Sequence, residues 1–112
     1  MLKITTQVNR GIIFIRLEGN LNSSTINTFY DELNYLLYKQ GIHYYVLNFK
    51  NLDNIDQNIF TKFQNILTEI FLSCGQVVMC GVNKLQKRVI GTSKDKLFYV
   101  NEEQDAFKYL KI

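Results

Sequence analysis

A short apolar run followed by a helical repeat, in the middle of the chain, constrains the fold most. Tyr45 to Phe49 has the β-branched and aromatic content of a core strand. Downstream, apolar residues recur at helical spacing, at Ile59, Phe63, Ile66, Leu67 and Ile70. We interpret the polar residues between the two as a short loop. Asp56, Gln57 and Asn58 are therefore expected at a strand-to-helix turn, where function is expected to lie.

The N-terminal third of the chain predicts a hairpin and a helix. Apolar and polar residues alternate from Leu2 to Val8, and Asn9 to Gly11 supplies a turn before a second strand at Ile12 to Leu17. Polar N-cap candidates at residues 22–24 then precede an apolar helix face that ends near Gly41. This face is expected to cover a sheet.

The C-terminal third repeats the alternation of strand and helix. Val77 to Val82 is a continuous apolar strand, and Asn83 is expected to cap a short helix whose apolar residues are Leu85, Val89 and Ile90. A short strand at Leu97 to Val100 and a final helix follow, with Asn101 and Gln104 resembling a capping box. The order ββαβαβαβα predicts a single α/β domain over residues 1–112. Its mixed, mainly parallel sheet is expected to have the first strand as an antiparallel edge.

Length and charge limit the classes of function. The 112 residues are 46% hydrophobic, enough for one domain with its own core. The net charge of +3, from 13 basic and 10 acidic residues, gives no support for a nucleic-acid partner. We expect the basic cluster of Lys84, Lys87, Arg88, Lys94 and Lys96 to be a solvated surface. No apolar run is long enough to span a membrane and no secretory signal is visible, so a cytoplasmic location is expected.

Side chains for catalysis or metal binding are scarce. His43 is the only histidine and has no nucleophile placed beside it in the sequence, and neither common glycine-rich phosphate loop occurs. Cys74 and Cys80 are interpreted as free thiols, and the sequence has no recognisable zinc ligand set. Asp53 and Asp56 are interpreted as turn and cap residues. We therefore expect no enzymatic activity, no cofactor and no metal.

Three segments, in this order and spacing, resemble the STAS domain of SpoIIAA-like bacterial anti-sigma factor antagonists. Ile15 to Asn22 resembles the family's opening strand and its Leu-x-Gly-x-Leu-Asp turn, with Asn22 in place of the aspartate. Tyr45 to Phe49 resembles its central strand, and Gly75 to Ile90 its fourth strand and the helix that follows. The resemblance covers essentially the whole chain, and it implies a cytoplasmic protein-binding regulator.

The family's phosphorylation signature is altered in this chain. The family has Asp-Ser-Ser-Gly at the start of its second helix, and a cognate kinase phosphorylates the second serine. The matching residues here are Asp56, Gln57, Asn58 and Ile59. Asn58 thus occupies the phosphoacceptor position and has no hydroxyl to accept phosphate. Ile59, where the family has glycine, is expected either to crowd a closely approaching partner or to point into the core.

The resemblance implies an anti-sigma factor of the GHKL serine kinase type, or another STAS protein, as the partner. We expect the contact surface to consist of Asn22, Ser23, Asp56, Gln57, Asn58 and Thr61, because both loops should open at the same end of the sheet. Binding there is expected to be constitutive, or regulated on the partner. The domain itself is expected to be a monomer or a weak homodimer.

Other interpretations remain open from the sequence. The domain is alternatively a scaffold or assembly module outside any kinase circuit, which Ile59 favours if it crowds the partner. A transporter-associated STAS domain is a further alternative, with no motif that supports it. Ser23, Ser24, Thr25 and Thr61 are hydroxyls near the site, and helix capping or surface exposure explains them more simply than phosphorylation does.

Overall fold

A single five-stranded sheet organises the chain, in a computed structural model that describes residues 2–73, 75–90 and 97–110. The strands lie in the order in which they occur along the chain. Their bounds are β1 (Leu2–Asn9), β2 (Ile12–Leu21), β3 (Tyr44–Ile55), β4 (Gln76–Cys80) and β5 (Leu97–Val100). β1 pairs with β2 antiparallel and every other pair is parallel. The predicted mixed, mainly parallel α/β sheet with an antiparallel first edge strand is confirmed.

A two-residue turn joins β1 and β2. Arg10 and Gly11 both have positive φ angles, of 55° and 80°. Positive φ at both central residues is the geometry of a type I′ turn, whose twist matches that of the flanking strands. The predicted hairpin is confirmed.

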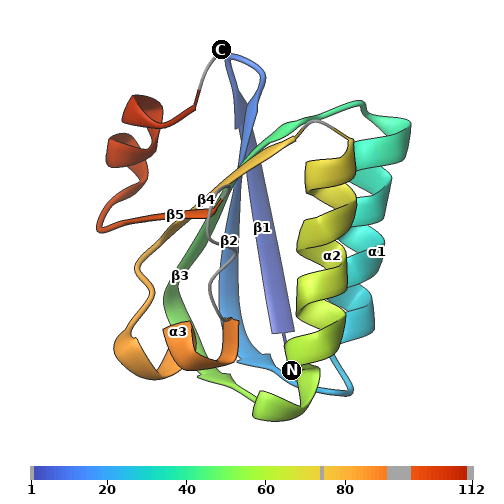
Figure 1. The fold of residues 1–112 in the computed structure, drawn as a ribbon, viewed down its shortest axis with the longest axis vertical. Helices are drawn as coiled ribbons and strands as arrows, with labels where there is room; N and C mark the ends of the chain where they lie inside the picture. The colour runs from blue at the N-terminus through green and yellow to red at the C-terminus, as the bar shows by residue number, and fades with distance from the viewer. Residues whose placement is uncertain (1, 74, 91–96, 111–112) are drawn as a thin grey trace.

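Helices cover one face of the sheet, and a shorter segment covers part of the other. α1 and α2 lie side by side over one face, whereas the C-terminal segment lies on the opposite face (Figure 1). The helical bounds are α1 (Ile26–Asn34), the π-helical turn η1 (Tyr35–Lys39), the 3-10 turn η2 (Gln57–Ile59), α2 (Phe60–Leu72), α3 (Lys84–Ile90) and the 3-10 helix η3 (Glu103–Lys108). The expected final helix is therefore only a short 3-10 helix.

Two apolar cores result, one on each face of the sheet. The larger core lies under α1 and α2, where the rings of Phe29 and Phe63 stack with centroids 5.8 Å apart. The smaller core joins the sheet to η3, and its members are Ile12, Phe14, Val46, Val78, Cys80, Ala106 and Leu110. Burial of both faces explains the continuous apolar runs of β2, β3 and β4.

β3 is longer than expected and includes most of the segment that was expected to be a loop. Residues 50–54, interpreted as a loop, are part of β3 and pair with β2. The register shifts twice along this pair. Arg16 faces Asn48, whereas Glu18, two residues later, faces Asn51. Gly19 faces Leu52, whereas Asn20, the next residue, faces Asn54. Each shift inserts one extra residue in β3, which is the signature of a β-bulge. β2 likewise continues to Leu21, beyond the expected strand end at Leu17.

Details of the C-terminal third also differ from the expectations. Leu85 of α3 is 69% exposed instead of buried. The final helix begins one residue later than expected, with Glu102 and Asp105 forming the capping box instead of Asn101 and Gln104. Cys80 is a buried free thiol, as predicted. Cys74 lies outside the described residues.

Candidate functional site

The loops that follow β2 and β3 are joined by a backbone hydrogen bond. The amide of Asp56 donates to the carbonyl of Leu21 at 2.9 Å. Both loops follow parallel strands, and the carboxyl ends of such strands open at one edge of a sheet. The structure therefore brings the expected Asn22 and Ser23 to the same end as Asp56, Gln57 and Asn58.

The Asn22 side chain organises the first loop. Its Oδ1 accepts hydrogen bonds from the amides of Ser24 and Thr25, at 2.9 and 3.1 Å, and from the Ser24 hydroxyl at 2.7 Å. The Thr25 hydroxyl donates to the carbonyl of Asn20 at 2.9 Å. These two hydroxyls therefore hold the turn together, whereas Ser23 is exposed at its tip.

Asp56 begins the second loop as an N-cap. Its Oδ1 accepts a hydrogen bond from the amide of Asn58 at 3.1 Å. Asp56 is therefore a cap residue, as expected, and Asn58 lies inside the 3-10 turn. Gln57, Asn58 and Thr61 are all exposed at this end of α2.

Ile59 points into the core. It is 1% exposed and belongs to the larger apolar cluster. Its side chain therefore adds nothing to the surface of the loop. Of the two expectations for Ile59, burial in the core is the one confirmed.

A shallow cavity of about 260 Å³ borders the second loop on the side of α3. Its walls are the bulged end of β3, Gln57 and the start of α3. At the start of α3, the Gln86 amide donates to Asn83 Oδ1 at 2.8 Å, and the Asn83 amide donates to Gln86 Oε1 at 3.0 Å. The predicted cap at Asn83 is thus confirmed. The exposed Leu85 also lines this cavity. No sequence signal pointed to this role, because a leucine at helical spacing predicts burial.

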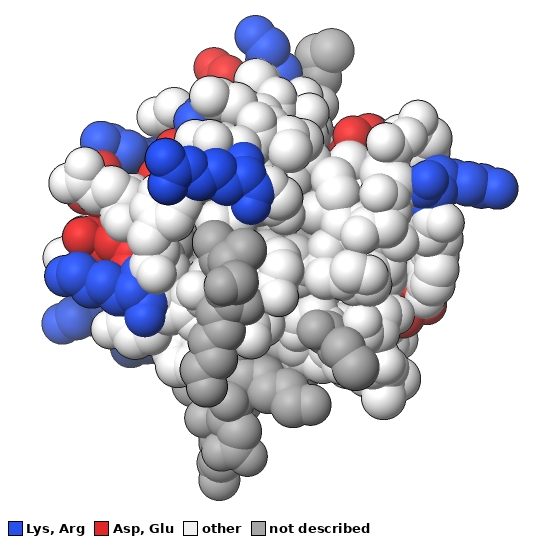
Figure 2. Space-filling view, turned by 90° about the horizontal axis from the view of Figure 1, so that it is seen from above, with Lys and Arg blue, Asp and Glu red and all other residues white. Residues whose placement is uncertain are grey.

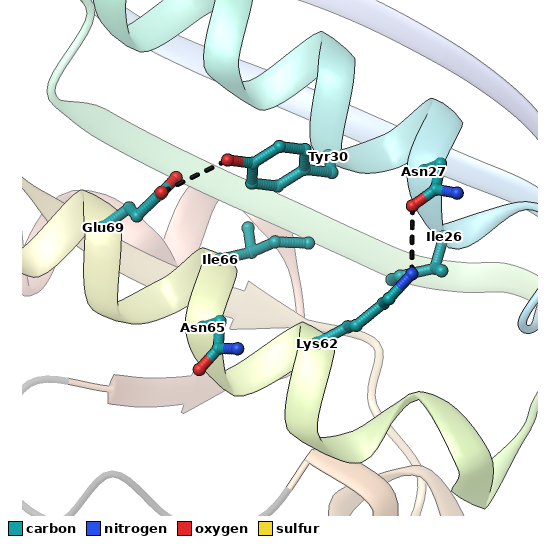
Figure 3. A pocket seen from close by; sticks show the side chains of 7 residues that line it. All are labelled: Ile26, Asn27, Tyr30, Lys62, Asn65, Ile66 and Glu69. Carbon is teal, nitrogen blue, oxygen red and sulfur yellow. Dashed lines mark hydrogen bonds between the residues drawn. The ribbon is translucent and has the colours of Figure 1, made fainter.

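A second groove, of about 280 Å³, runs between α1 and α2 (Figure 3). Ile26 and Ile66 line it between two polar pairs. Lys62 Nζ donates to Asn27 Oδ1 at 3.3 Å, and the Tyr30 hydroxyl donates to Glu69 Oε1 at 3.2 Å. Ile26 lies just after the first loop and Lys62 just after Thr61, so the groove extends the loop surface along the helices.

His43 lies away from these loops, and Cys80 is buried. His43 is exposed just before β3, at the opposite end of the sheet. Burial raises the pKa of the Cys80 thiol to about 12. Within residues 2–73, 75–90 and 97–110, no group of three or more histidine, cysteine, aspartate or glutamate side chains is placed to hold a metal ion.

Charge is also sparse around the helices. Seen from the end of the β1–β2 turn, charged side chains of both signs gather on the side of η3, and the side of α1 and α2 is mostly uncharged (Figure 2). At the loop end, Lys84, Lys87 and Arg88 of the basic cluster are exposed on α3 as expected, and Lys94 and Lys96 lie outside the described residues. None of the described helices has the length and apolarity needed to span a membrane. The loop end therefore places the Asp56 carboxylate and several amide side chains beside a basic short helix.

Comparisons with known proteins identify the fold. The sequence profile of the STAS domain matches residues 3–94. A sequence search of curated proteins gives no match. Many solved structures are similar, and the three described below are each at low sequence identity, so they establish the fold alone.

Three similar structures are those of SpoIIAA in two phosphorylation states and of a candidate anti-sigma factor antagonist. A candidate antagonist from Thermotoga maritima is 17% identical, with a TM-score of 0.79 over 94% of this chain and 92% of that one. Unphosphorylated SpoIIAA is 15% identical, with a TM-score of 0.75 over 95% and 96%. Phosphorylated SpoIIAA from Bacillus is 14% identical, with a TM-score of 0.70 over 96% and 98%.

STAS domains with this fold are generally regulators without catalytic activity. The sheet order, the two joined loops and the profile match over most of the chain agree with one another. This chain therefore belongs to the STAS domain family and has the fold of SpoIIAA.

Proposed function

We propose that this chain is a protein-binding regulator of the anti-sigma factor antagonist type. Its partner is an anti-sigma factor of the GHKL serine kinase type. The contact surface consists of Asn22, Ser23, Asp56, Gln57, Asn58 and Thr61. The hydrogen bond from Asp56 to Leu21 is the observation that carries the proposal, because it holds the two loops together as one surface before any partner arrives.

Asn58 keeps this surface in one charge state. Its side chain is exposed and neutral, and its amide already donates to Asp56. A phosphate on a serine here would add about −1.5 to −2 charges beside that carboxylate. An asparagine accepts no phosphate, so partner binding through this surface is constitutive unless the partner itself is regulated.

The burial of Ile59 removes the argument that favoured a scaffold. That argument required the isoleucine side chain to stand between the loop and a partner. Ile59 is 1% exposed, so the loop surface is open to the backbone approach that a glycine would allow. We therefore propose the antagonist and treat binding to other STAS proteins as an outcome of the test.

The experiment is affinity capture from the native cell lysate with tagged wild-type protein and two variants. Asn58→Glu adds a charge within the proposed surface. Asn9→Glu makes the same substitution at an exposed position at the opposite end of the sheet. A GHKL-type kinase retained by wild type and by Asn9→Glu, but not by Asn58→Glu, supports the proposal.

Calorimetry with the captured kinase then measures the effect. An unpaired charge inside an interface is costly, so Asn58→Glu should weaken binding at least about tenfold. Asn58→Ser should bind as wild type does, and with ATP it should incorporate phosphate. Equal binding by Asn58→Glu, or capture of other STAS proteins alone, would contradict the proposal.

A further inference from the structure

The outer edge of β1 has few of the features that protect sheet edges. Among the described residues β1 pairs with β2 alone, over eight residues in continuous register. Natural edge strands are usually short, bulged, charged or interrupted by proline. β1 has a single charge, at Lys3, and no proline. The opposite edge, β5, is only four residues long.

Exposure of β1 is greatest toward its end. Val8 is 59% exposed, and residues 5–9 are all exposed. Leu2 and Ile4 are only partly buried against the larger core. The strand therefore presents unpaired backbone groups together with apolar side chains at one long edge.

The sequence of β1 is complementary to itself when two copies run antiparallel about Thr5. Residues that face each other across antiparallel strands point to the same face of the sheet. On the face of α1 and α2, Leu2 would meet Val8 of the second copy and Ile4 would meet Thr6. On the other face, Lys3 would meet Gln7, and Thr5 would meet its own counterpart. No pair places like charges together.

We propose that β1 is a homodimerisation edge, at which two copies of this chain pair through antiparallel β1 strands centred on Thr5. The two sheets then form one continuous sheet, and Val8 is covered by Leu2 of the second copy. Because Leu2 lies opposite Gly19 near the end of β2, the two loop surfaces lie at opposite ends of the dimer. Each copy therefore keeps its partner-binding loops accessible.

Sedimentation velocity over a wide range of protein concentrations tests this edge. Wild type should change reversibly from monomer to dimer as concentration rises. Thr5→Lys and Thr5→Glu each place like charges opposite each other at the centre. Each should raise the dimer dissociation constant at least about fivefold. An equimolar mixture of the two variants should form a heterodimer at least as stable as the wild-type dimer.

The control is Thr28→Lys, the same substitution at an exposed position on α1. It should dimerise as wild type does. Thr5 faces Arg16 on β2, so thermal unfolding of each variant verifies that the fold is retained. A wild type that stays monomeric, a dimer unaffected by Thr5→Lys, or a folded mixture without heterodimer would overturn the proposal.

Discussion

The Arg16 guanidinium holds the Glu103 carboxylate by two hydrogen bonds, at 2.9 and 2.8 Å, across 87 positions of sequence. Asn48 donates a third bond to the same carboxylate at 2.8 Å, and Arg16 also donates to Gln7 at 2.9 Å. Strands β1, β2 and β3 thus contribute to one polar network that attaches η3 to the sheet. This network lies beside Phe14, a member of the smaller core.

Stability should depend on the ionisation of Glu103. The hydrogen bond from Arg16 lowers the pKa of Glu103 below its ordinary value. A carboxyl with a lowered folded-state pKa stabilises the fold above its unfolded pKa, and this contribution is lost as pH falls through the folded-state pKa. Glu103→Gln should lower the free energy of unfolding by about 1 kcal/mol at pH ~7, a value reduced for partial exposure.

Urea unfolding at neutral pH and at about pH 3 measures this effect. The difference between wild type and Glu103→Gln should shrink at the acid pH, which lies below the unfolded-state pKa of the carboxyl, and it should vanish as pH falls through the lowered folded-state pKa. Glu18→Gln, at an exposed position on β2, is the matched control and should behave as wild type. A loss in Glu103→Gln that is the same at both pH values would refute the ionic contribution.

The Asp56 cap of the second loop should contribute measurably to the free energy of unfolding. Asp56→Ala removes the acceptor for the Asn58 amide and should cost about 1 kcal/mol of unfolding free energy. Asp56→Asn keeps an acceptor oxygen and should cost less. Chemical denaturation of the three proteins gives the comparison, and an alanine variant as stable as wild type would show that the cap is dispensable.

Ile59 should behave as a core residue. Ile59→Ala should destabilise the protein by roughly 2–4 kcal/mol, because it leaves a cavity in the larger core, and Ile59→Val by roughly 0.5–1.5 kcal/mol. Thermal and urea unfolding measure both. A surface role would instead predict stability close to wild type, together with altered partner binding.

The Cys80 thiol should be unreactive in the folded protein. Burial raises its pKa to about 12, so almost no thiolate forms near neutral pH. A Cys74→Ser variant isolates Cys80, and a chromogenic disulfide reagent then reports its accessibility. We expect labelling only after urea is added. Labelling of the folded variant at the rate of an unfolded peptide would contradict the burial.

The sequence predicts most elements because their apolar periodicity is strong. The face of α2 from Ile59 to Ile70 and the buried run of β3 keep a clear period, and the structure has both. The second half of β3 was not predicted from the sequence because of its two bulges. They put Leu52 and Ile55 three residues apart, although both are buried, so the alternation that marks a strand is lost.

The candidate site was predictable in position but not in detail. A polar segment between a strand and a helix indicates the Asp56 loop, and topology places the Asn22 loop beside it. The sequence also indicates Asp56 as a cap residue, but it does not reveal which amide the Asp56 carboxylate accepts a hydrogen bond from. Leu85 was missed because α3 is short and lies at the border of the sheet, where one side of a helix turn stays in solvent.

The strand order has a consequence for how the protein is made. Neighbours in the sheet are also neighbours in the chain, so each strand from β2 onward emerges during synthesis beside an edge that already exists. The sheet can grow in one direction as the ribosome advances. Arg16 pairs with Glu103, which emerges 87 residues later, after every strand of the sheet. Formation of that pair therefore attaches η3 to a sheet whose five strands have already been synthesised.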